Sequence, residues 1–167
     1  MSYDKPRRKS NGSLSDPAMK ALYGCLVLGC CLFSFGFSRA DTFEIEDTGA
    51  ALLVKEKDNP VFVYNYKPVS PPPEASSFLP RSCYIHPLYG LDGDILTQDW
   101  PSDHFHHRGV FWAWPWCQVL RRRMDLWLSR DARQHFDRWL EQTIEKDSVV
   151  IGVQNSWRFD DEPDKTP

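Results

Sequence analysis

After residue 40, the pattern of hydrophobic and polar positions predicts short β-strands. Residues 42–46 alternate apolar and polar side chains and are followed by an Asp-Thr-Gly turn, which is typical of a strand that ends in a turn. Residues 50–55 and 61–66 show the same character, and a Lys-Asp-Asn-Pro turn separates them. We therefore expect the domain to begin with three antiparallel strands.

The next segment predicts a loop, because residues 67–80 contain five prolines and proline removes the backbone donor that a sheet needs. Strand character returns in residues 81–89 and, after a Gly-Leu-Asp-Gly-Asp turn, in residues 95–97. The turn lacks the ligand spacing of an EF-hand, so it does not predict a calcium site. Residues 148–159 are a further strand-like run.

Residues 118–146 support two interpretations. The segment has no glycine or proline and carries an apolar residue at every fourth position, which is typical of an amphipathic helix at about residues 120–144. The other interpretation places breaks at two charged triplets and leaves short strands at residues 124–128 and 134–140. The pattern alone favours the helix.

Together these segments predict a mostly β domain with antiparallel sheets over residues 41–159, followed by an acidic tail at residues 160–167. The helical interpretation of the segment near residue 130 would make the fold α+β instead. A chain of 167 residues has room for one such domain.

The N-terminus predicts a leader of residues 1–40. A polar, basic stretch precedes residues 21–37, which carry no charge, and Ser-Arg-Ala ends at Ala40. This order is typical of a secretory signal, with cleavage after Ala40 and a secreted or periplasmic domain. Two alternatives stay open: an uncleaved membrane anchor formed by residues 21–37, and a lipoprotein box that ends at Cys30.

Cleavage would change the charge and the cysteine content of the protein. The remaining chain has 14 basic and 21 acidic residues, a net charge of −7, so it has no general attraction to nucleic acid or to an anionic membrane surface. Cys83 and Cys117 are the two cysteines left. In an exported protein they could form one disulfide or stay free.

The candidate chemistry lies in residues 98–117, which hold three of the five histidines and four of the seven tryptophans. If residues 104–107 are extended, His104 and His106 share one face and could bind one divalent metal ion. A third ligand would come from His86 or Asp103.

The same residues also have a purely structural interpretation. Arg108 would pair with Asp99 or Asp103, and the imidazoles would cap turns. Alternation would place three further side chains on one face of a strand and in the sandwich core; these are Trp112, Trp114 and Trp116.

Two motifs resemble the PmoA-like family, a largely uncharacterised group of bacterial proteins labelled "methane oxygenase PmoA". They are Ser-x-Tyr-x-His-Pro-Leu at residues 82–88 and His-His-Arg-Gly-x-Phe-Trp-Ala-Trp at residues 106–114. The resemblance implies a β-sandwich of the mutarotase-like (supersandwich) kind and favours strands in residues 118–146. Because family members are longer, it also implies that the sandwich is incomplete at the C-terminus. Five residues match the polar core of the family: His86, His104, His106, His107 and Arg108.

The sandwich architecture implied by the resemblance, the export signal and the tryptophans favour carbohydrate binding or processing, since aromatic faces stack on sugar rings. His86 or His106 would transfer a proton while Arg108 orients a hydroxyl. The candidate binding residues are Trp100, Asp103 and Trp112.

Two other functions remain open at this stage. One is a metal-dependent enzyme of the oxygenase or hydrolase type, with a divalent ion on His104 and His106. The other is a non-catalytic structural or interaction module. Bound metal in the purified protein would distinguish the metal-dependent enzyme from the non-catalytic module. A response to sugars would favour carbohydrate binding.

Overall fold

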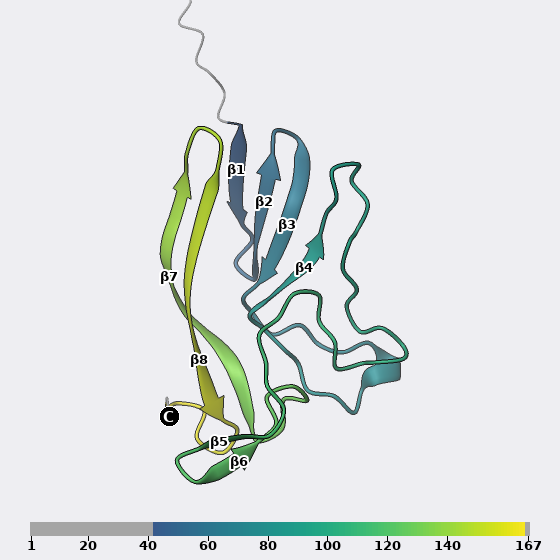
Figure 1. The fold of residues 1–167 in the computed structure, drawn as a ribbon, viewed down its shortest axis with the longest axis vertical. Coiled ribbons are helices and arrows are strands. Elements are labelled where there is room, and N and C mark those ends of the chain that lie inside the picture. Colours follow the sequence, from purple (N-terminus) through teal and green to yellow (C-terminus); the bar gives the residue numbers. More distant parts are fainter. Residues whose placement is uncertain (1–41, 166–167) are drawn as a thin grey trace, which may run out of the picture. The chain divides into compact units, whose positions relative to one another are not determined.

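The predicted antiparallel strands form one sheet in the computed structural model, which describes residues 42–165 (Figure 1). Its strands are β1 (Phe43–Asp47), β2 (Ala51–Glu56), β3 (Asn59–Asn65) and β4 (Tyr84–Leu88), hydrogen-bonded in that order. The expected leader, membrane anchor and lipoprotein box lie outside the described residues.

A long hairpin packs against this sheet. β7 (Ala132–Ile144) and β8 (Val149–Phe159) pair antiparallel, and Figure 1 shows them beside β1–β4. The core between the two layers holds Tyr64 and Tyr66 from one side and Trp139 from the other, with the ring centroids of Tyr66 and Trp139 5.3 Å apart. The domain is therefore mostly β, antiparallel and sandwich-like, as predicted.

The helix predicted at about residues 120–144 is wrong, because most of this segment is β7. A spacing of four residues is about one turn of a helix but also two repeats of a strand, so the pattern fits both. Bulges then shift the register of β7. As a result Trp139 follows Phe136 into the core, and Leu140 is exposed.

A short hairpin precedes β7. β5 (Cys117–Val119) pairs with β6 (Arg122–Met124) through a turn whose two central residues, Leu120 and Arg121, both have positive φ. The strand predicted at residues 124–128 is therefore wrong beyond its first residue, which ends β6. The hairpin contributes Met124 to a second buried cluster.

The remaining predictions for the described residues concern a loop and two cysteines. The proline-rich loop is present and contains one 3-10 turn, η1 (Pro73–Ala75). The two cysteines do not form the disulfide, since Cys83 and Cys117 are both free. Burial raises the pKa of the Cys83 thiol. No helix within residues 42–165 is long and apolar enough to span a bilayer.

The turn after β1 is tied to the core by one hydrogen bond, and this gives a test of the local electrostatics. The Tyr66 hydroxyl donates to Asp47 Oδ1 at 2.6 Å, and this bond is the main reason that the pKa of Asp47 lies below its usual value. We expect Tyr66→Phe to raise the pKa of Asp47 in an NMR titration. The low pKa of Asp161, which depends on Arg122, should not move.

Candidate functional site

The residues between β4 and β5 form the candidate site, and two backbone bridges hold them in place. Val110 pairs with Ile85 in β4, and Arg108 pairs with Asp99. Gly109 stands between the two bridges with φ of 46°, a left-handed conformation that favours glycine. The motif that looked like a strand in the sequence is therefore a loop folded against the edge of the sheet.

Arg108 lies at the bottom of this loop, with 2% of its side chain exposed. Its Nη1 donates to the carbonyl oxygens of Phe105 at 2.7 Å and His107 at 2.8 Å. Its Nε is 3.6 Å from Asp99 Oδ1, and its guanidinium lies over the ring of Trp100. Of the two partners predicted for Arg108, Asp99 and Asp103, the structure shows Asp99. These contacts indicate that Arg108 shapes the loop from within.

Asp99 also contacts the sheet below it. The Tyr84 hydroxyl donates to Asp99 Oδ2 at 2.9 Å, and burial raises the pKa of both side chains. Burial lowers the pKa of Arg108 to about 10, so the guanidinium stays charged at pH 7. The nearby His86 is half-buried, with Nδ1 2.9 Å from the Thr97 hydroxyl. This polar layer links the loop to β4.

Three imidazoles lie above this layer and form what we call the imidazole cluster: His104, His106 and His107. The rings of His104 and His107 stack, with centroids 4.9 Å apart and planes 8° apart, and His106 is 4.5 Å from His107. Asp103 Oδ2 is 3.1 Å from His104 Nδ1 at the exposed rim. The segment is a series of turns, so the extended conformation that would place His104 and His106 on one face is not formed.

The surroundings of His106 lower the pKa of its ring and so favour the neutral form. Burial lowers its pKa, and the neighbouring rings His107 and His104 lower it further, because a second positive charge among them is unfavourable. A neutral imidazole can accept a proton from a bound hydroxyl.

The predicted metal site has no preformed ligand set. Among residues 42–165, no three side chains of His, Cys, Asp or Glu are placed to hold a metal ion, and a stable site needs at least three. The described residues therefore do not fit the divalent ion that the sequence suggested at His104 and His106.

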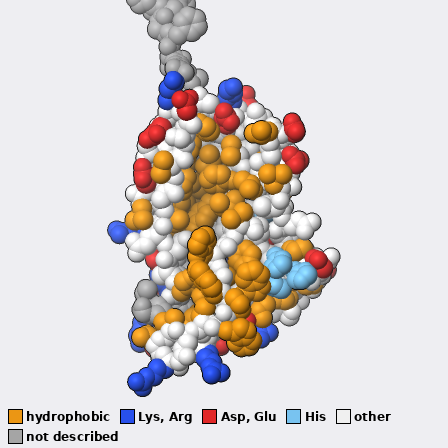
Figure 2. All heavy atoms as spheres, in the orientation of Figure 1, with side chains coloured by type: hydrophobic (Ala, Val, Ile, Leu, Met, Phe, Trp, Pro, Cys, Tyr) orange, Lys and Arg blue, Asp and Glu red, His pale blue; other side chains and the backbone are white. Residues whose placement is uncertain are grey.

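A pocket of about 320 Å³ opens beside the imidazole cluster, and its lining includes His107, Thr97, Phe111 and Trp127. The ring of Trp127 lies edge-on to His107, with centroids 5.6 Å apart, and 5.2 Å from Phe111. Figure 2 shows the histidines gathered in one patch next to hydrophobic side chains. Polar rings and apolar rings therefore share one surface.

Arg81 holds Trp127 in this position and was missed in the sequence. Its guanidinium donates to the carbonyls of Leu126 at 2.9 Å and Trp127 at 3.1 Å, and it lies 4.5 Å from the ring of Phe111. Arg81 is buried, and a buried guanidinium needs several acceptors. An arginine at the start of a strand-like run was the only available signal.

The other aromatic predictions divide into two groups. Trp100 packs beneath the loop against Arg108 and Phe78. The prediction that the three later tryptophans form sandwich core is wrong, because their segment runs outside the sheets; Trp112, Trp114 and Trp116 are 67%, 52% and 83% exposed. Trp112 is thus accessible to a ligand, as the binding prediction required.

A family model described as a family of unknown function (DUF6807) matches residues 51–165. No curated protein and no solved structure matches the chain. The matched residues include the whole imidazole cluster and the pocket beside it. The description names no activity, so the resemblance to the PmoA-like family stays a prediction.

Proposed function

The chain belongs to the DUF6807 family of unknown function, and we propose that it is an exported β-domain that binds carbohydrate through the imidazole cluster and the aromatic rings beside it. The ligand would enter the pocket between His107, Phe111 and Trp127. Export follows from the leader predicted in residues 1–40.

The observation that carries the proposal is the placement of hydrogen-bonding imidazole rings next to apolar rings. A sugar presents hydroxyl groups around its edge and C–H groups on its faces. Imidazole nitrogens can donate to and accept from hydroxyl groups, while Trp127 and Phe111 offer apolar area to the ring face. Trp112, 67% exposed, could extend the surface to a longer glycan.

The buried layer beneath the site would act by positioning. Arg108 binds the carbonyls of Phe105 and His107, so it sets the course of the loop that carries the imidazoles. The pKa of His106 is lowered by its surroundings, which favours the neutral ring, so His106 would take up a proton if the bound sugar reaches it and is also processed.

The test is calorimetric titration of the chain with a panel of mono- and oligosaccharides, beside the Trp127→Ala variant. We expect at least one glycan to bind, and Trp127→Ala to weaken binding about tenfold, or about 1.4 kcal/mol, because a stacking surface is lost. Trp116→Ala is the matched control, since Trp116 is 83% exposed and does not line this pocket.

Two results would count against the proposal. The first is no heat of binding with any glycan, which would favour the structural or interaction module. The second is equal binding by the Trp127→Ala and Trp116→Ala variants, which would place any sugar elsewhere. Circular dichroism of each variant shows whether its fold is retained.

A further inference from the structure

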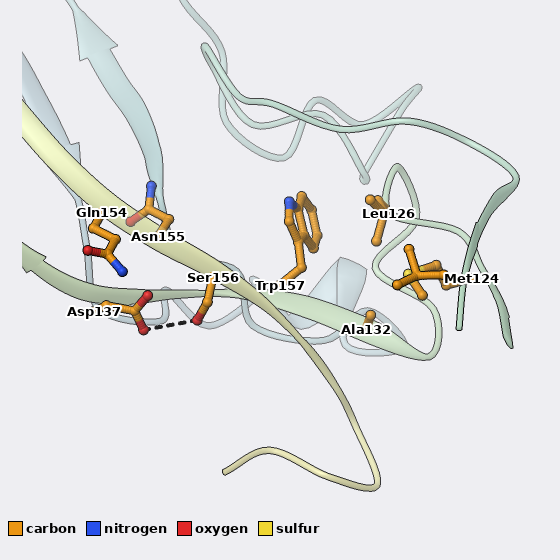
Figure 3. Close-up of a pocket in the computed structure, with 9 residues that line it drawn as sticks. Met124, Leu126, Ala132, Asp137, Gln154, Asn155, Ser156 and Trp157 are labelled. Carbon is orange, nitrogen blue, oxygen red and sulfur yellow. Dashed lines mark hydrogen bonds between the residues drawn. The ribbon is translucent and has the colours of Figure 1, made fainter. Parts of the chain in front are cut away.

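A second pocket, of about 340 Å³, lies where the β5–β6 hairpin meets the β7–β8 hairpin (Figure 3). Its lining includes the apolar side chains Val119, Met124 and Leu126. Asn155 lies on the face of β8 that also carries Trp157, while Asp137 and Ser156 bond to each other on the opposite face. No residue of this pocket lines the pocket beside the imidazole cluster. Its volume is at the lower end of the range for small-molecule sites.

A bulge in β7 places Asp137 at the edge of the pocket. Phe136 pairs with Asn155 and Arg138 pairs with Gln154, so Asp137 between them has no cross-strand partner. A bulge of this kind redirects a side chain and is common beside functional sites. Here it brings the Asp137 carboxylate to Ser156 in the neighbouring strand (Figure 3), with Ser156 Oγ donating to Asp137 Oδ1 at 2.9 Å.

The negative charge of Asp137 is already compensated. Arg158 Nη2 donates to Asp137 Oδ1 at 2.7 Å. A ligand would therefore not need a positive charge to make burial of the carboxylate favourable. The second oxygen of Asp137 remains able to accept a hydrogen bond.

Asn155 supplies a second acceptor. Its Nδ2 donates to the Tyr64 hydroxyl at 2.8 Å, which fixes the orientation of the amide. Its Oδ1 is buried and has no hydrogen-bond partner among the described residues. Buried polar atoms are nearly always paired, so this oxygen indicates a place for a hydrogen-bond donor. A ligand in this pocket would therefore have to supply a hydrogen-bond donor to Asn155 Oδ1.

Trp157 stands between Asn155 and the apolar side chains of the pocket. Figure 3 shows its indole rising from β8 with Asn155 on one side and Leu126 and Met124 on the other. An aromatic ring in this position offers an apolar face to a ring-shaped ligand whose edge carries hydroxyl groups.

From these features we infer that this pocket is a second, separate binding site for a neutral sugar ring. A hydroxyl group of the ligand would donate to Asn155 Oδ1 and its C–H face would lie against Trp157, since both side chains project from the same face of β8. The inference does not rest on the proposed function, because the two pockets share no lining residue.

The test uses the full chain with Trp127→Ala, so that the first pocket binds about tenfold more weakly. Methyl glycosides of glucose, galactose and mannose are the probes, and saturation-transfer NMR with competition gives their affinities. We expect at least one probe to bind. Val119→Trp fills the pocket from a position that is 38% exposed, so it should weaken glycoside binding at least about tenfold. The matched Val119→Thr should change the affinity less than about twofold.

A second pair of variants keeps the test decisive if Val119→Trp does not fold. Asn155→Ala removes the unpaired acceptor together with its bond to Tyr64, while Tyr64→Phe removes only that bond. We expect Asn155→Ala to lose binding and Tyr64→Phe to retain it.

The inference is overturned if no methyl glycoside binds the Trp127→Ala chain, or if Val119→Trp binds as strongly as Val119→Thr. Tighter binding of glucosamine than of glucose would also contradict it, because that result requires an uncompensated negative charge. Failure of the proposed function gives a different result. In that case the single variant Val119→Trp would lose the glycan response, and the single variant Trp127→Ala would keep it.

Discussion

Arg108→Ala is expected to destabilise the domain by about 3 to 5 kcal/mol, the loss that follows when one partner of a buried ion pair is removed. The variant leaves the Asp99 carboxyl in a buried position without its cation, and the carbonyls of Phe105 and His107 lose their donor. Urea denaturation followed by circular dichroism measures the change as a lower midpoint.

The pH dependence of this loss has a definite sign. Burial already raises the pKa of Asp99, and removing Arg108 raises it further. A carboxyl with a raised pKa in the folded state binds its proton more tightly there than in the unfolded chain, so its contribution to stability falls as the pH rises above about 4. The deficit of Arg108→Ala should therefore be larger at pH 7 than at pH 4.

The control is Arg123→Ala, which removes an arginine from an exposed position in β6 and should cost less than about 0.5 kcal/mol. Arg108→Lys keeps the charge but lacks the planar fork that reaches two carbonyls, so it should fall between the two. Equal stability of the Arg108→Ala and Arg123→Ala variants would show that the buried pair contributes nothing.

The sequence identified most of the fold, because the signals for β1, β2 and β3 are local. Alternation and turn residues are sufficient for a meander, in which neighbours in sequence pair in space. The long strand β7 was ambiguous because a four-residue spacing fits a helix and a strand equally. What decided it was the packing of Phe136 and Trp139 on Tyr66, which lies far away in the sequence.

In the candidate site, too, contacts between residues close in sequence could be predicted and distant contacts could not. The pairing of Arg108 with Asp99 could be predicted, as one of two alternatives with Asp103, because Asp99 and Arg108 are only nine positions apart. Arg81 could not be assigned, since its acceptors at Leu126 and Trp127 lie more than forty positions later. The tryptophan prediction failed for a different reason: alternation fixes a face only within a strand, and residues 111–114 are not in one.

The second pocket had no sequence signal because it depends on a bulge. Alternation along β8 places Asn155 and Trp157 on one face, but the position of Asp137 follows from the register shift in β7. A bulge is a property of the paired strands rather than of either strand alone. Residue 137 therefore fell within the helix that the pattern favoured, and residues 155–157 looked like ordinary strand positions.

Gly109→Ala is the substitution with the most direct steric consequence, and we expect it to cost more than about 3 kcal/mol. A Cβ at this position would overlap the backbone carbonyl oxygen of Ile85 and lie 3.0 Å from Cβ of His86. The same carbonyl accepts the Val110 N–H at 2.9 Å, and Gly109 N donates to Gln98. Making room for the methyl group would break the bridge that holds the imidazole cluster against β4.

Gly93→Ala separates this steric effect from backbone strain. Gly93 has φ of 83°, and no atom of the described residues lies within 4 Å of the place that a Cβ would occupy. Alanine there should therefore cost only the strain of a left-handed residue, about 1 to 2 kcal/mol. Denaturation midpoints of the two variants give the comparison.

Because Gly109 lies between β4 and the imidazoles, Gly109→Ala should also abolish the glycan response of the first pocket while Gly93→Ala preserves it. A Gly109→Ala protein as stable as Gly93→Ala would mean that β4 and the loop do not approach this closely in solution.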